Sequence, residues 1–260
     1  MTMSIDFNSD MGESFGLWER GADEAMLEVI SSANVACGFH AGDPNAMHAT
    51  VASAKRQGVA PGAHPGYPDL LGYGRRRLDV DPSHLRNYVL YQVGALAAFL
   101  RVAGLRMHHV KPHGALYMAA LEEAAVARSI AQAVAEYDAE LAIYTIAGSE
   151  MAHAAQRAGL NAVPEFFADR PLNQDGSVVM FGWQALFEPT PEAVADRVRS
   201  LVSSGKVASL QGGEVAVEAR TVCVHSDTPG AAEIGRAVRQ ALDGAQLRVV
   251  AEPTPGSKTA

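Results

Sequence analysis

The chain has 260 residues and a mass of 27.4 kDa, which exceeds most single domains but is usual for an undivided all-β or α/β barrel. Hydrophobic residues make up 48% and charged residues 19%, enough to bury a large core, so intrinsic disorder is excluded. The formal net charge of −8 repels phosphate backbones and anionic lipid headgroups, which argues against nucleic acid and membrane partners.

Short apolar runs of strand length alternate with helical patterns along the whole chain. The runs cover residues 4–9, 34–39, 59–63, 108–111, 141–146, 162–167, 221–224 and 247–250. Because this alternation has no long linker or composition shift, we expect one (β/α) barrel domain over residues 1–251. An open doubly wound sheet is the alternative, since strand order is invisible in sequence. Residues 252–260 contain two prolines and small polar side chains, which predicts a frayed tail.

Helix boundaries are marked by proline and glycine. An N-cap oxygen precedes proline in four places, at Asp43-Pro44, Asp81-Pro82, Thr190-Pro191 and Thr228-Pro229. The cap accepts a free backbone N–H, and proline lacks the N–H that would stay unpaired, so each pair predicts a helix start. Three glycines follow helical segments and predict helix ends, at Gly58, Gly104 and Gly159.

Three further segments carry structural predictions. The most apolar long stretch, residues 89–103, contains Gln92 and Arg101 and is shorter than a bilayer span, so we expect a packed helix. Residues 169–188 predict a polar loop, and residues 211–214 predict a hairpin turn.

The two cysteines indicate the cellular compartment. Cys37 and Cys223 each lie in an apolar run, so we expect buried thiols and no disulfide framework. This cysteine usage favours the reducing cytoplasm. The chain shows no basic start followed by an apolar stretch, so we expect no secretory signal.

Titratable residues follow six of the eight predicted strands. They are Asp10 and Glu13, His40 and Asp43, His64 and Asp69, Lys111 and His113, Asp169 and Arg170, and His225 and Asp227. In a (β/α) barrel the carboxyl ends of the strands converge on one face, where the active sites of this fold lie. The pattern therefore favours the barrel over the open sheet and predicts a site at that face.

The first strand carries a polar inward face. Asp6, Asn8 and Asp10 alternate in sequence, so on a regular strand they point to one side. Unpaired buried carboxylates are costly, and a cluster of this kind indicates either a site or a turn-stabilising network. Glu13 is compatible with the site or with a first-turn helix charge.

Three histidines lie at junctions between a predicted strand and the next helix. His40, His64 and His113 could each be a metal ligand, a general base or a donor to a loop carbonyl. Catalytic zinc commonly takes three protein ligands, and Asp10, His40 and His64 would be that set here. The chain has no HExxH motif and no paired CxxC motif, so a metal-free acid–base site is the other hypothesis.

Cationic residues at the same face could hold anions. Lys111 could bind a carboxylate or phosphate while His113 moves protons. Asp169-Arg170 predicts an ion pair or a substrate-orienting pair, and residues 75–77 give a basic run, RRR, that is solvated or reaches an anionic substrate. No phosphate-cradling loop motif is present, so a nucleotide would need helix N-termini, side chains or another subunit.

Six strings stand in order along most of the chain. They are DFNSDMGESFG, SSANVACGFHAGDP, GAHPGYPDLLGYGRR, HVKPHGALY, FFADRPLNQDG and TVCVHSDTPGA. Together they resemble the LamB/YcsF family of lactam-utilisation proteins. The resemblance implies an irregular seven-stranded (β/α) barrel of the glycoside hydrolase/deacetylase superfamily, so one of the eight predicted strands should be peripheral. Ser9, Ser226 and residues 179–187, VMFGWQALF, depart from the family pattern, the last of them in a loop over the expected site.

The resemblance also implies an activity, that of the A subunit of 5-oxoprolinase. This is the ATP-dependent hydrolytic opening of 5-oxo-L-proline to L-glutamate, with ATP shared between this chain and partner subunits B and C. The acid–base residues would be Asp10, His40, His64 and His113. The substrate- and phosphate-binding residues would be Asn8, Glu13, Lys111, Asp169, Arg170, His225 and Asp227. A stand-alone metal-dependent amidase or deacetylase, and a non-catalytic subunit that binds oxoproline and docks the others, are the alternative functions.

Overall fold

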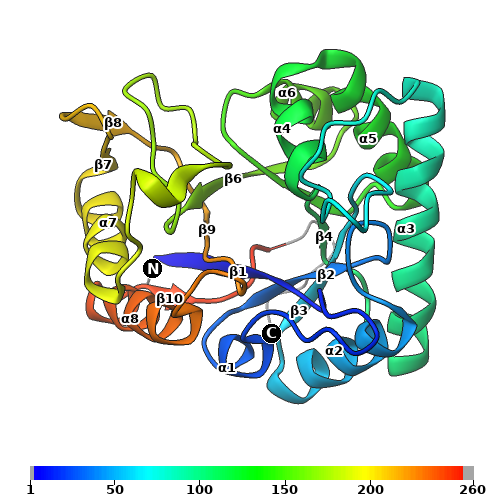
Figure 1. Cartoon of the computed structure of the whole chain (residues 1–260), viewed down its shortest axis with the longest axis horizontal. Coiled ribbons are helices and arrows are strands. Elements are labelled where there is room, and N and C mark those ends of the chain that lie inside the picture. Colours follow the sequence, from blue (N-terminus) through cyan, green and yellow to red (C-terminus); the bar gives the residue numbers. More distant parts are fainter. Residues whose placement is uncertain (1–2, 254–260) are drawn as a thin grey trace.

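The computed structural model describes residues 3–253, in which parallel strands close into a barrel surrounded by helices (Figure 1). Seven strands are hydrogen-bonded in chain order: β1 (Ser4–Met11), β2 (Ser32–Ala36), β3 (Ala60–His64), β4 (His109–Val110), β5 (Ala142–Thr145), β6 (Asn161–Phe167) and β9 (Thr221–Cys223). Strand β9 also pairs with β1, which closes the ring. The predicted seven-stranded (β/α) barrel is confirmed, and the open sheet is excluded.

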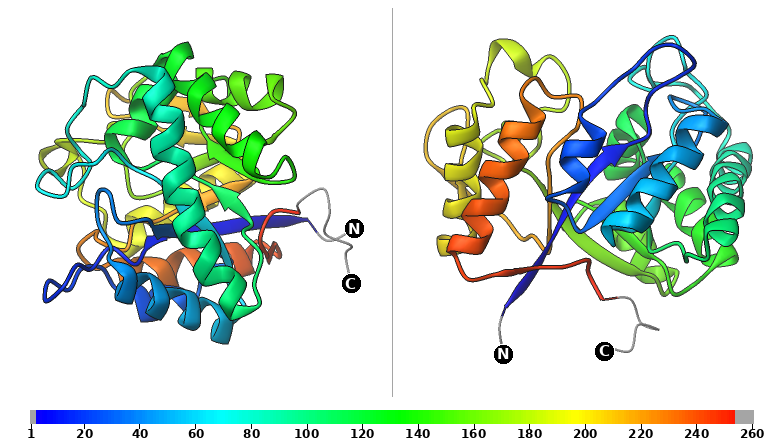
Figure 2. Two further views of the ribbon diagram at one scale, coloured as in Figure 1. Left: turned by 90° about the vertical axis from the view of Figure 1, so that its right-hand side faces the viewer. Right: turned by 90° about the horizontal axis from the view of Figure 1, so that it is seen from below.

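The eighth predicted strand is the peripheral one. It is β10 (Arg248–Val249), which pairs only with Ser4 and Ile5 at the start of β1. Figure 2 shows this last described segment passing below the barrel beside the start of β1. It lies at the end opposite the strand carboxyl ends and therefore takes no part in a site there.

Eight α-helices of the described chain pack outside the strands. They are α1 (Asp23–Leu27), α2 (Pro44–Gln57), α3 (Pro82–Ala103), α4 (Gly114–Glu122), α5 (Ala124–Tyr137), α6 (Glu150–Arg157), α7 (Pro191–Ser204) and α8 (Ala231–Gly244). Helices α7 and α8 lie on one flank, and α3 and α5 on the opposite flank (Figure 1). Asp43, Asp81 and Thr190 are N-caps, as predicted.

The fourth predicted helix start was wrong. Helix α8 begins at Ala231 with Gly230 at its N-cap, two residues after Pro229. The hydroxyl of Thr228 instead donates to Asp169 at 2.7 Å. The same hydroxyl oxygen accepts from Arg170 Nη1 at 3.0 Å, so a guanidinium from another strand end takes the place of the helix N–H that this oxygen would otherwise have capped.

The long apolar stretch is a packed helix, as predicted. It belongs to α3, which buries Val89, Val93 and Leu96. The side chain of Gln92 is buried too, and it accepts from the Gly66 amide at 2.9 Å and donates to the Gly66 carbonyl at 3.0 Å. Between residues 3 and 253, no helix is both long and apolar enough to cross a bilayer.

Two excursions leave the barrel after β6. The predicted loop contains a short 3₁₀ turn, η1 (Trp183–Ala185), and a bridge between Leu172 and Val178. The predicted hairpin is confirmed by the antiparallel pair β7 (Lys206–Ala208) and β8 (Glu214–Ala216).

The predicted tail begins at Glu252. Its carboxylate is paired with Arg220 at 2.5 Å and its carbonyl accepts from His108 at 2.7 Å. Residues 254–260 lie outside the described part of the chain.

The barrel interior contains both apolar and polar layers. Cys37 and Cys223 are buried free thiols, as predicted, and burial raises the pKa of Cys37 to about 12. On the inward face of β1, the fully buried Asp6 accepts from Ser32 at 2.8 Å and from Thr221 at 2.6 Å. Asp6 is therefore satisfied by hydroxyl donors deep in the barrel, and Asn8 and Asp10 follow on the same face toward its mouth.

Candidate functional site

The carboxyl ends of six strands converge as the barrel geometry requires. All of the predicted site residues lie at this end, and all but the half-buried Asp227 are buried. They are Asn8, Asp10, Glu13, His40, His64, Lys111, His113, Asp169, Arg170, His225 and Asp227.

Lys111 is the deepest cation of the cluster. Its Nζ lies 3.2 Å from Asp10 Oδ1, 2.8 Å from Glu165 Oε1 and 3.1 Å from Cys223 Sγ. Burial opposes its charge, yet the carboxylates raise the pKa of Lys111 well above its ordinary value. Burial likewise opposes ionisation of Asp10, but His64 and Lys111 hold the pKa of Asp10 well below its ordinary value. Lys111 therefore positions Asp10 and keeps it ionised.

Three imidazoles and one carboxylate form a compact group above this cation. The rings of His40 and His113 stack at 3.7 Å between centroids, and His113 Nδ1 lies 3.0 Å from His64 Nε2. Glu13 Oε1 is 3.4 Å from His40 Nε2 and 3.5 Å from His113 Nδ1. One ligand atom from each of the four residues lies within 4.8 Å of all the others. Gly74 makes the packing possible, because a Cβ there would lie 2.6 Å from His40 Cβ.

In two of these rings the outer nitrogen is already hydrogen-bonded to a backbone carbonyl. His64 Nδ1 lies 2.7 Å from the Lys111 carbonyl, and His113 Nε2 lies 2.9 Å from the Tyr73 carbonyl. A carbonyl only accepts, so both nitrogens donate. In the neutral rings the two inner nitrogens then carry lone pairs that face each other at 3.0 Å. Such an arrangement repels unless a proton or a metal cation lies between the rings.

The remaining atoms of the group also lack a positive partner. Among the described residues, Glu13 Oε1 and both ring nitrogens of His40 are buried without a hydrogen bond. Burial lowers the pKa of His40 and His113 well below the ordinary value, which favours the neutral imidazoles that bind a metal ion. Three imidazoles and one carboxylate are a donor set that suits a divalent transition metal. The side chains present therefore fit such an ion.

The candidate metal-binding group overlaps only partly with the set expected from the sequence. His40 and His64 belong to it, and Glu13 and His113 complete it. Asp10 stands at its edge, with Oδ2 at 3.3 Å from His64 Nε2 and Oδ1 turned toward Lys111. The strand register places Asp10 against the cation below, which is why it is not among the four.

Asp10 and Glu13 have opposite pKa shifts. Burial raises the pKa of Glu13, and the nearby charges of Asp227 and Asp10 raise it further. Glu13 also accepts a hydrogen bond from the Tyr73 hydroxyl. Because the pKa of Asp10 is lowered, Asp10 is the carboxyl group that stays ionised, and Glu13 is the one that more readily holds a proton.

A second group surrounds His225. His225 Nδ1 lies 3.0 Å from Asp169 Oδ1, and Arg170 Nη1 lies 2.9 Å from Asp169 Oδ2. Although burial opposes it, Arg170 and His225 lower the pKa of Asp169. His225 Nε2 faces Asp10 Oδ2 at 3.7 Å. Asp169 and Arg170 are thus an ion pair, as one of the two sequence hypotheses held, and the pair orients His225 toward Asp10.

The three arginines of the basic run, residues 75–77, pair with different carboxylates at the rim of the site. Arg75 and Arg20 each contact Asp227 Oδ2 at 2.7 Å, whereas Arg76 pairs with Asp69 and Arg77 with Glu123. Only the first arginine of the run lines the site cavity. The carboxylate of Asp43 caps α2 and is outside the cluster.

The cavity between these groups is small. It has a volume of about 20 Å³ and is lined on its polar side by Asp10, His64, Arg75, Lys111, His113, Arg170 and His225. Such a volume holds about one water molecule. Its other lining residues are Pro112, Gly114, Tyr117, Phe167, Met180 and Phe181. Met180 and Phe181 belong to the segment 179–187 that departs from the family pattern. This segment covers the mouth of the site.

Three contributors were not predicted from the sequence. Glu165 balances Lys111, Tyr73 supports Glu13 and His113, and the Asn34 amide donates to Asp10 Oδ1 at 2.8 Å. Glu165 had a signal, since it is a lone carboxylate inside the apolar run of β6. Tyr73 had none, because its position depends on how the loop after β3 folds back.

Metal binding gives the first testable prediction. We expect the protein to bind one Zn²⁺ or Mn²⁺ ion, raising its free energy of unfolding by about 2.7 kcal/mol at a free metal concentration of 100 times Kd. His40→Ala should weaken binding by more than the roughly 10–100-fold typical of changes around a metal ligand. Isothermal titration and thermal melts of the full chain measure both quantities.

His48→Ala is the matched control, since His48 is exposed on α2. It should leave the affinity unchanged. Equal metal affinity in wild type and His40→Ala would show that His40 does not take part.

Comparisons with known proteins find relatives that match nearly the whole chain. The model of the LamB/YcsF family matches residues 5–256. A curated relative from Syntrophobacter fumaroxidans, named as the A subunit of 5-oxoprolinase, is 48% identical over 249 residues, covering 96% of this chain and 98% of the relative. A relative of the same name from Thermococcus onnurineus is 45% identical over 95% of this chain and 97% of its own length. The crystal structure of a lactam utilization protein from Thermus thermophilus superposes with a TM-score of 0.91 at 45% identity, covering 96% of this chain and 100% of that one.

Proposed function

Because this chain is a member of the LamB/YcsF family, we propose that it is the hydrolytic A subunit of a 5-oxoprolinase, which opens 5-oxo-L-proline to L-glutamate. Relatives of that name, 45–48% identical over nearly the whole chain, support the assignment. The observation that carries it is the pair of carboxyl groups, Asp10 and Glu13, whose pKa values are shifted in opposite directions beside one histidine cluster. Amide hydrolysis needs both a base and an acid, and we assign these roles to Asp10 and Glu13.

The proposed roles follow from the geometry. Asp10, held ionised by Lys111, accepts a proton from the attacking water, with His64 at 3.3 Å as its partner. In the metal-free protein Glu13 protonates the leaving ring nitrogen, directly or through His113; a metal bound to the Glu13 carboxylate would block this step. Lys111 is engaged by two carboxylates, so Arg75 and Arg170, which both line the cavity, are better placed to hold the substrate carboxylate or phosphate.

ATP is proposed to drive the reaction together with partner subunits B and C. A lactam carbonyl is a poor electrophile, and its oxygen becomes part of a leaving group when it attacks the γ-phosphorus and ADP departs. Water then adds to the ring carbon, and the C–N bond breaks as the nitrogen is protonated. A second water releases phosphate from the resulting acyl phosphate. Because the sequence has no phosphate-cradling loop motif, we assign the phosphorylation step to the assembled complex.

The surface around the mouth supports the proposed docking of these subunits. Exposed large hydrophobic side chains gather on the loops that follow β1, β3 and β6, at Phe15, Leu17, Trp18, Leu70, Leu71, Phe181 and Leu186. Leu17 and Leu71 are 99% and 97% exposed. Apolar side chains clustered around a site entrance are typical of protein–protein interfaces. Subunits docked there would also exclude water from the reaction.

Reconstitution tests the proposal. We expect glutamate and ADP to form from 5-oxo-L-proline and ATP when this chain is mixed with its B and C subunits, and to cease when any one is omitted. Turnover that continues without this chain would overturn its assigned role. Full-rate phosphorylation of oxoproline by the isolated chain would overturn the assignment of the phosphorylation step to the assembled complex.

A stand-alone metal-dependent amidase is the second candidate function. The buried and unpartnered Glu13 Oε1 and His40 nitrogens favour it. A metal bound there would polarise the amide carbonyl and lower the pKa of a bound water. This candidate predicts hydrolysis of simple amides without ATP or partners, abolished by a chelator and restored by Zn²⁺ or Mn²⁺.

The segment over the mouth gives the second testable prediction. Phe181→Ala should lower KM for 5-oxo-L-proline several-fold or admit larger lactams, because the cavity of about 20 Å³ must open for any substrate to enter. Steady-state kinetics of the complete complex measure this effect.

Gln184→Ala is the matched control, since Gln184 is an exposed side chain of the same loop that does not line the cavity and is not part of the hydrophobic docking surface. If both variants change KM equally, Phe181 has no special part in closing the site.

A further inference from the structure

Four hydrogen bonds connect Asp10 to the opposite end of the barrel. Asn34 Nδ2 donates to Asp10 Oδ1 at 2.8 Å, and His109 Nε2 lies 2.6 Å from Asn34 Oδ1. The Nδ1 atoms of His109 and His108 are 3.0 Å apart, and His108 Nε2 lies 2.7 Å from the Glu252 carbonyl. The proposed function uses none of these residues except Asp10.

The site of His109 is built to hold an imidazole. His109 is fully buried, and its ring stacks on Tyr144 with 4.0 Å between centroids and 3° between planes. Gly62 faces the ring, and a Cβ at that position would overlap three of its atoms. The ring therefore lies between a tyrosine and a bare backbone, with its two nitrogens aimed along the chain of hydrogen bonds.

The orientation of the Asn34 amide is fixed by its other partners. Its Nδ2 also donates to Asn8 Oδ1 at 2.8 Å, and Asn8 Nδ2 donates to Glu165 Oε1 at 2.9 Å. Ionised Asp10 and Glu165 can only accept, so neither amide can be turned round. The oxygen of Asn34 must then face His109, and His109 Nε2 must carry a hydrogen.

The same reasoning applies at the other end. The Glu252 carbonyl only accepts, so His108 Nε2 must also carry a hydrogen. If both rings were neutral, their two Nδ1 atoms would be bare and would repel each other at 3.0 Å. One additional proton between them removes the repulsion. The pair then holds three N–H protons and one positive charge.

We propose that His108 and His109 form a singly protonated imidazole pair that positions Asn34 and, through Asn34, the carboxylate of Asp10. The positioning role rests on the proposed function of Asp10 as the base. With Oδ1 pinned by Asn34 and Lys111, the other oxygen, Oδ2, remains directed toward His64 and His225.

The surroundings lower the pKa of both rings, so the added proton follows from the facing Nδ1 atoms and not from the neighbouring charges. Burial is the main cause of the lowered pKa in both rings. For His109, the positive charges of Lys111 and His64 also lower the pKa, whereas the charge of Asp10 raises it. For His108, the charge of Asp6 raises the pKa. The other ionisable side chains facing the pair are Tyr144 and Glu252, the latter paired with Arg220.

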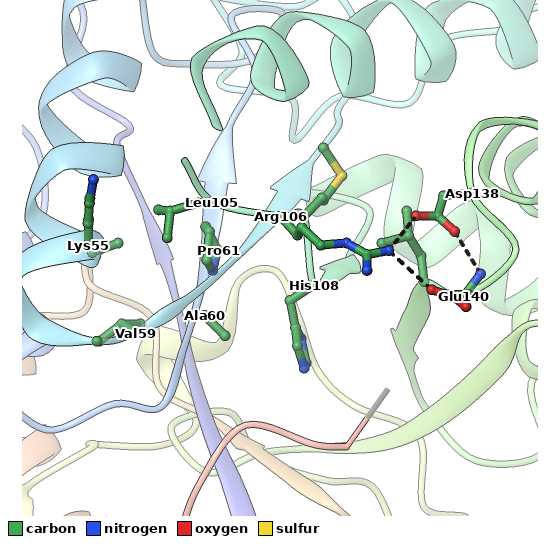
Figure 3. A pocket seen from close by; sticks show the side chains of 13 residues that line it. Lys55, Val59, Ala60, Pro61, Leu105, Arg106, His108, Asp138 and Glu140 are labelled. Atoms are coloured by element: carbon green, nitrogen blue, oxygen red, sulfur yellow. Dashed lines mark hydrogen bonds and ion pairs between the residues drawn. The ribbon is translucent and has the colours of Figure 1, made fainter. Parts of the chain in front are cut away.

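His108 also lines a pocket of about 380 Å³ at the amino ends of the strands, together with Lys55, Arg106, Asp138 and Glu140 (Figure 3). Solvent in this pocket gives His108 a route for proton exchange.

Nitrogen NMR of the full chain tests the proton count directly. In histidine-labelled protein near neutral pH, both Nε2 atoms should be protonated, with one N–H shared across the two Nδ1 atoms. His108→Asn assigns the signals, because its amide can donate to His109 Nδ1 while leaving that ring neutral. Two unprotonated Nδ1 atoms, or a deprotonated His108 Nε2, in the folded wild type would overturn the charged pair.

A pair of variants tests the positioning role. His109→Met removes the donor to Asn34 and should lower kcat of the complete complex by about 10–100-fold with little change in KM. His109→Gln keeps an N–H near the same place and should recover most of the loss. Equal losses in both variants, in proteins that melt like wild type, would reduce His109 to a packing role.

A second readout does not depend on turnover. Solvent exchange of the Asn34 side-chain amide should become at least about 10-fold faster in His109→Met and stay slow in His109→Gln. Unchanged exchange in His109→Met overturns the positioning role even if the complex proves inactive on 5-oxo-L-proline. Failure of the proposed function and failure of this inference are thereby distinguished.

Discussion

Asp10→Asn should abolish turnover of 5-oxo-L-proline, lowering kcat by about 10³-fold, the usual size of general acid–base catalysis. The amide cannot accept a proton from water, although it is almost the same shape as the carboxylate. The variant also leaves Lys111 facing only one nearby carboxylate, Glu165. Steady-state production of glutamate by the complete complex measures the loss, and KM should change far less than kcat.

Asp43→Asn is the matched control for this substitution. Asp43 lies at the same end of the barrel but caps α2, and asparagine is an equally good N-cap. It should leave kcat within about 2-fold of wild type, since surface changes that keep a cap are nearly neutral. If Asp10→Asn retained more than a tenth of the activity, another group would have to be the base.

Lys111→Met should be the most destabilising single substitution at the site, lowering the free energy of unfolding by about 3–5 kcal/mol. Removal of the ammonium leaves Asp10 and Glu165 buried without their shared cation. The loss should be largest at neutral pH. In the wild type the lowered pKa of Asp10 contributes stability above the ordinary Asp pKa of about 3.9, and this contribution disappears as the pH falls. Denaturant melts at pH 7 and at a pH of about 2.5, below the ordinary Asp pKa, measure the difference.

The double variant Lys111→Met/Glu165→Gln separates the electrostatic cause from lost packing. With one carboxylate neutralised, it should be more stable than Lys111→Met alone, with a coupling of about 0.5–3 kcal/mol between the two positions. Additive losses would mean that Lys111 contributes through its aliphatic stem rather than through its charge.

Much of the fold could be predicted because its signals are local. Alternating apolar runs, the N-caps Asp43, Asp81 and Thr190, and the helix-ending glycines each depend on a few neighbouring residues. The N-cap prediction failed at Thr228, where Asp169, from a different strand end, binds the hydroxyl. A long-range contact decided that helix start, and no local pattern carries it.

The functional site shows the same difference between local signals, which are visible in the sequence, and long-range contacts, which are not. Each of the predicted site residues lies at the barrel mouth, since a residue's place relative to the end of its own strand is a local property. Their partners were not predictable. Glu165 balances Lys111, Glu13 joins the imidazoles in place of Asp10, and His109 reaches Asn34.

The sequence by itself determined the alternation of strands and helices, the end of the barrel at which polar residues gather, and the family to which the chain belongs. Only the tertiary structure decided which strand is peripheral, which ring nitrogens face each other, and which carboxylate meets Lys111. The physical reason is the separation along the chain over which each interaction acts. Hydrophobic periodicity and capping act over a few residues, whereas hydrogen bonds and Coulomb interactions depend on distances of a few ångströms between residues far apart in the chain.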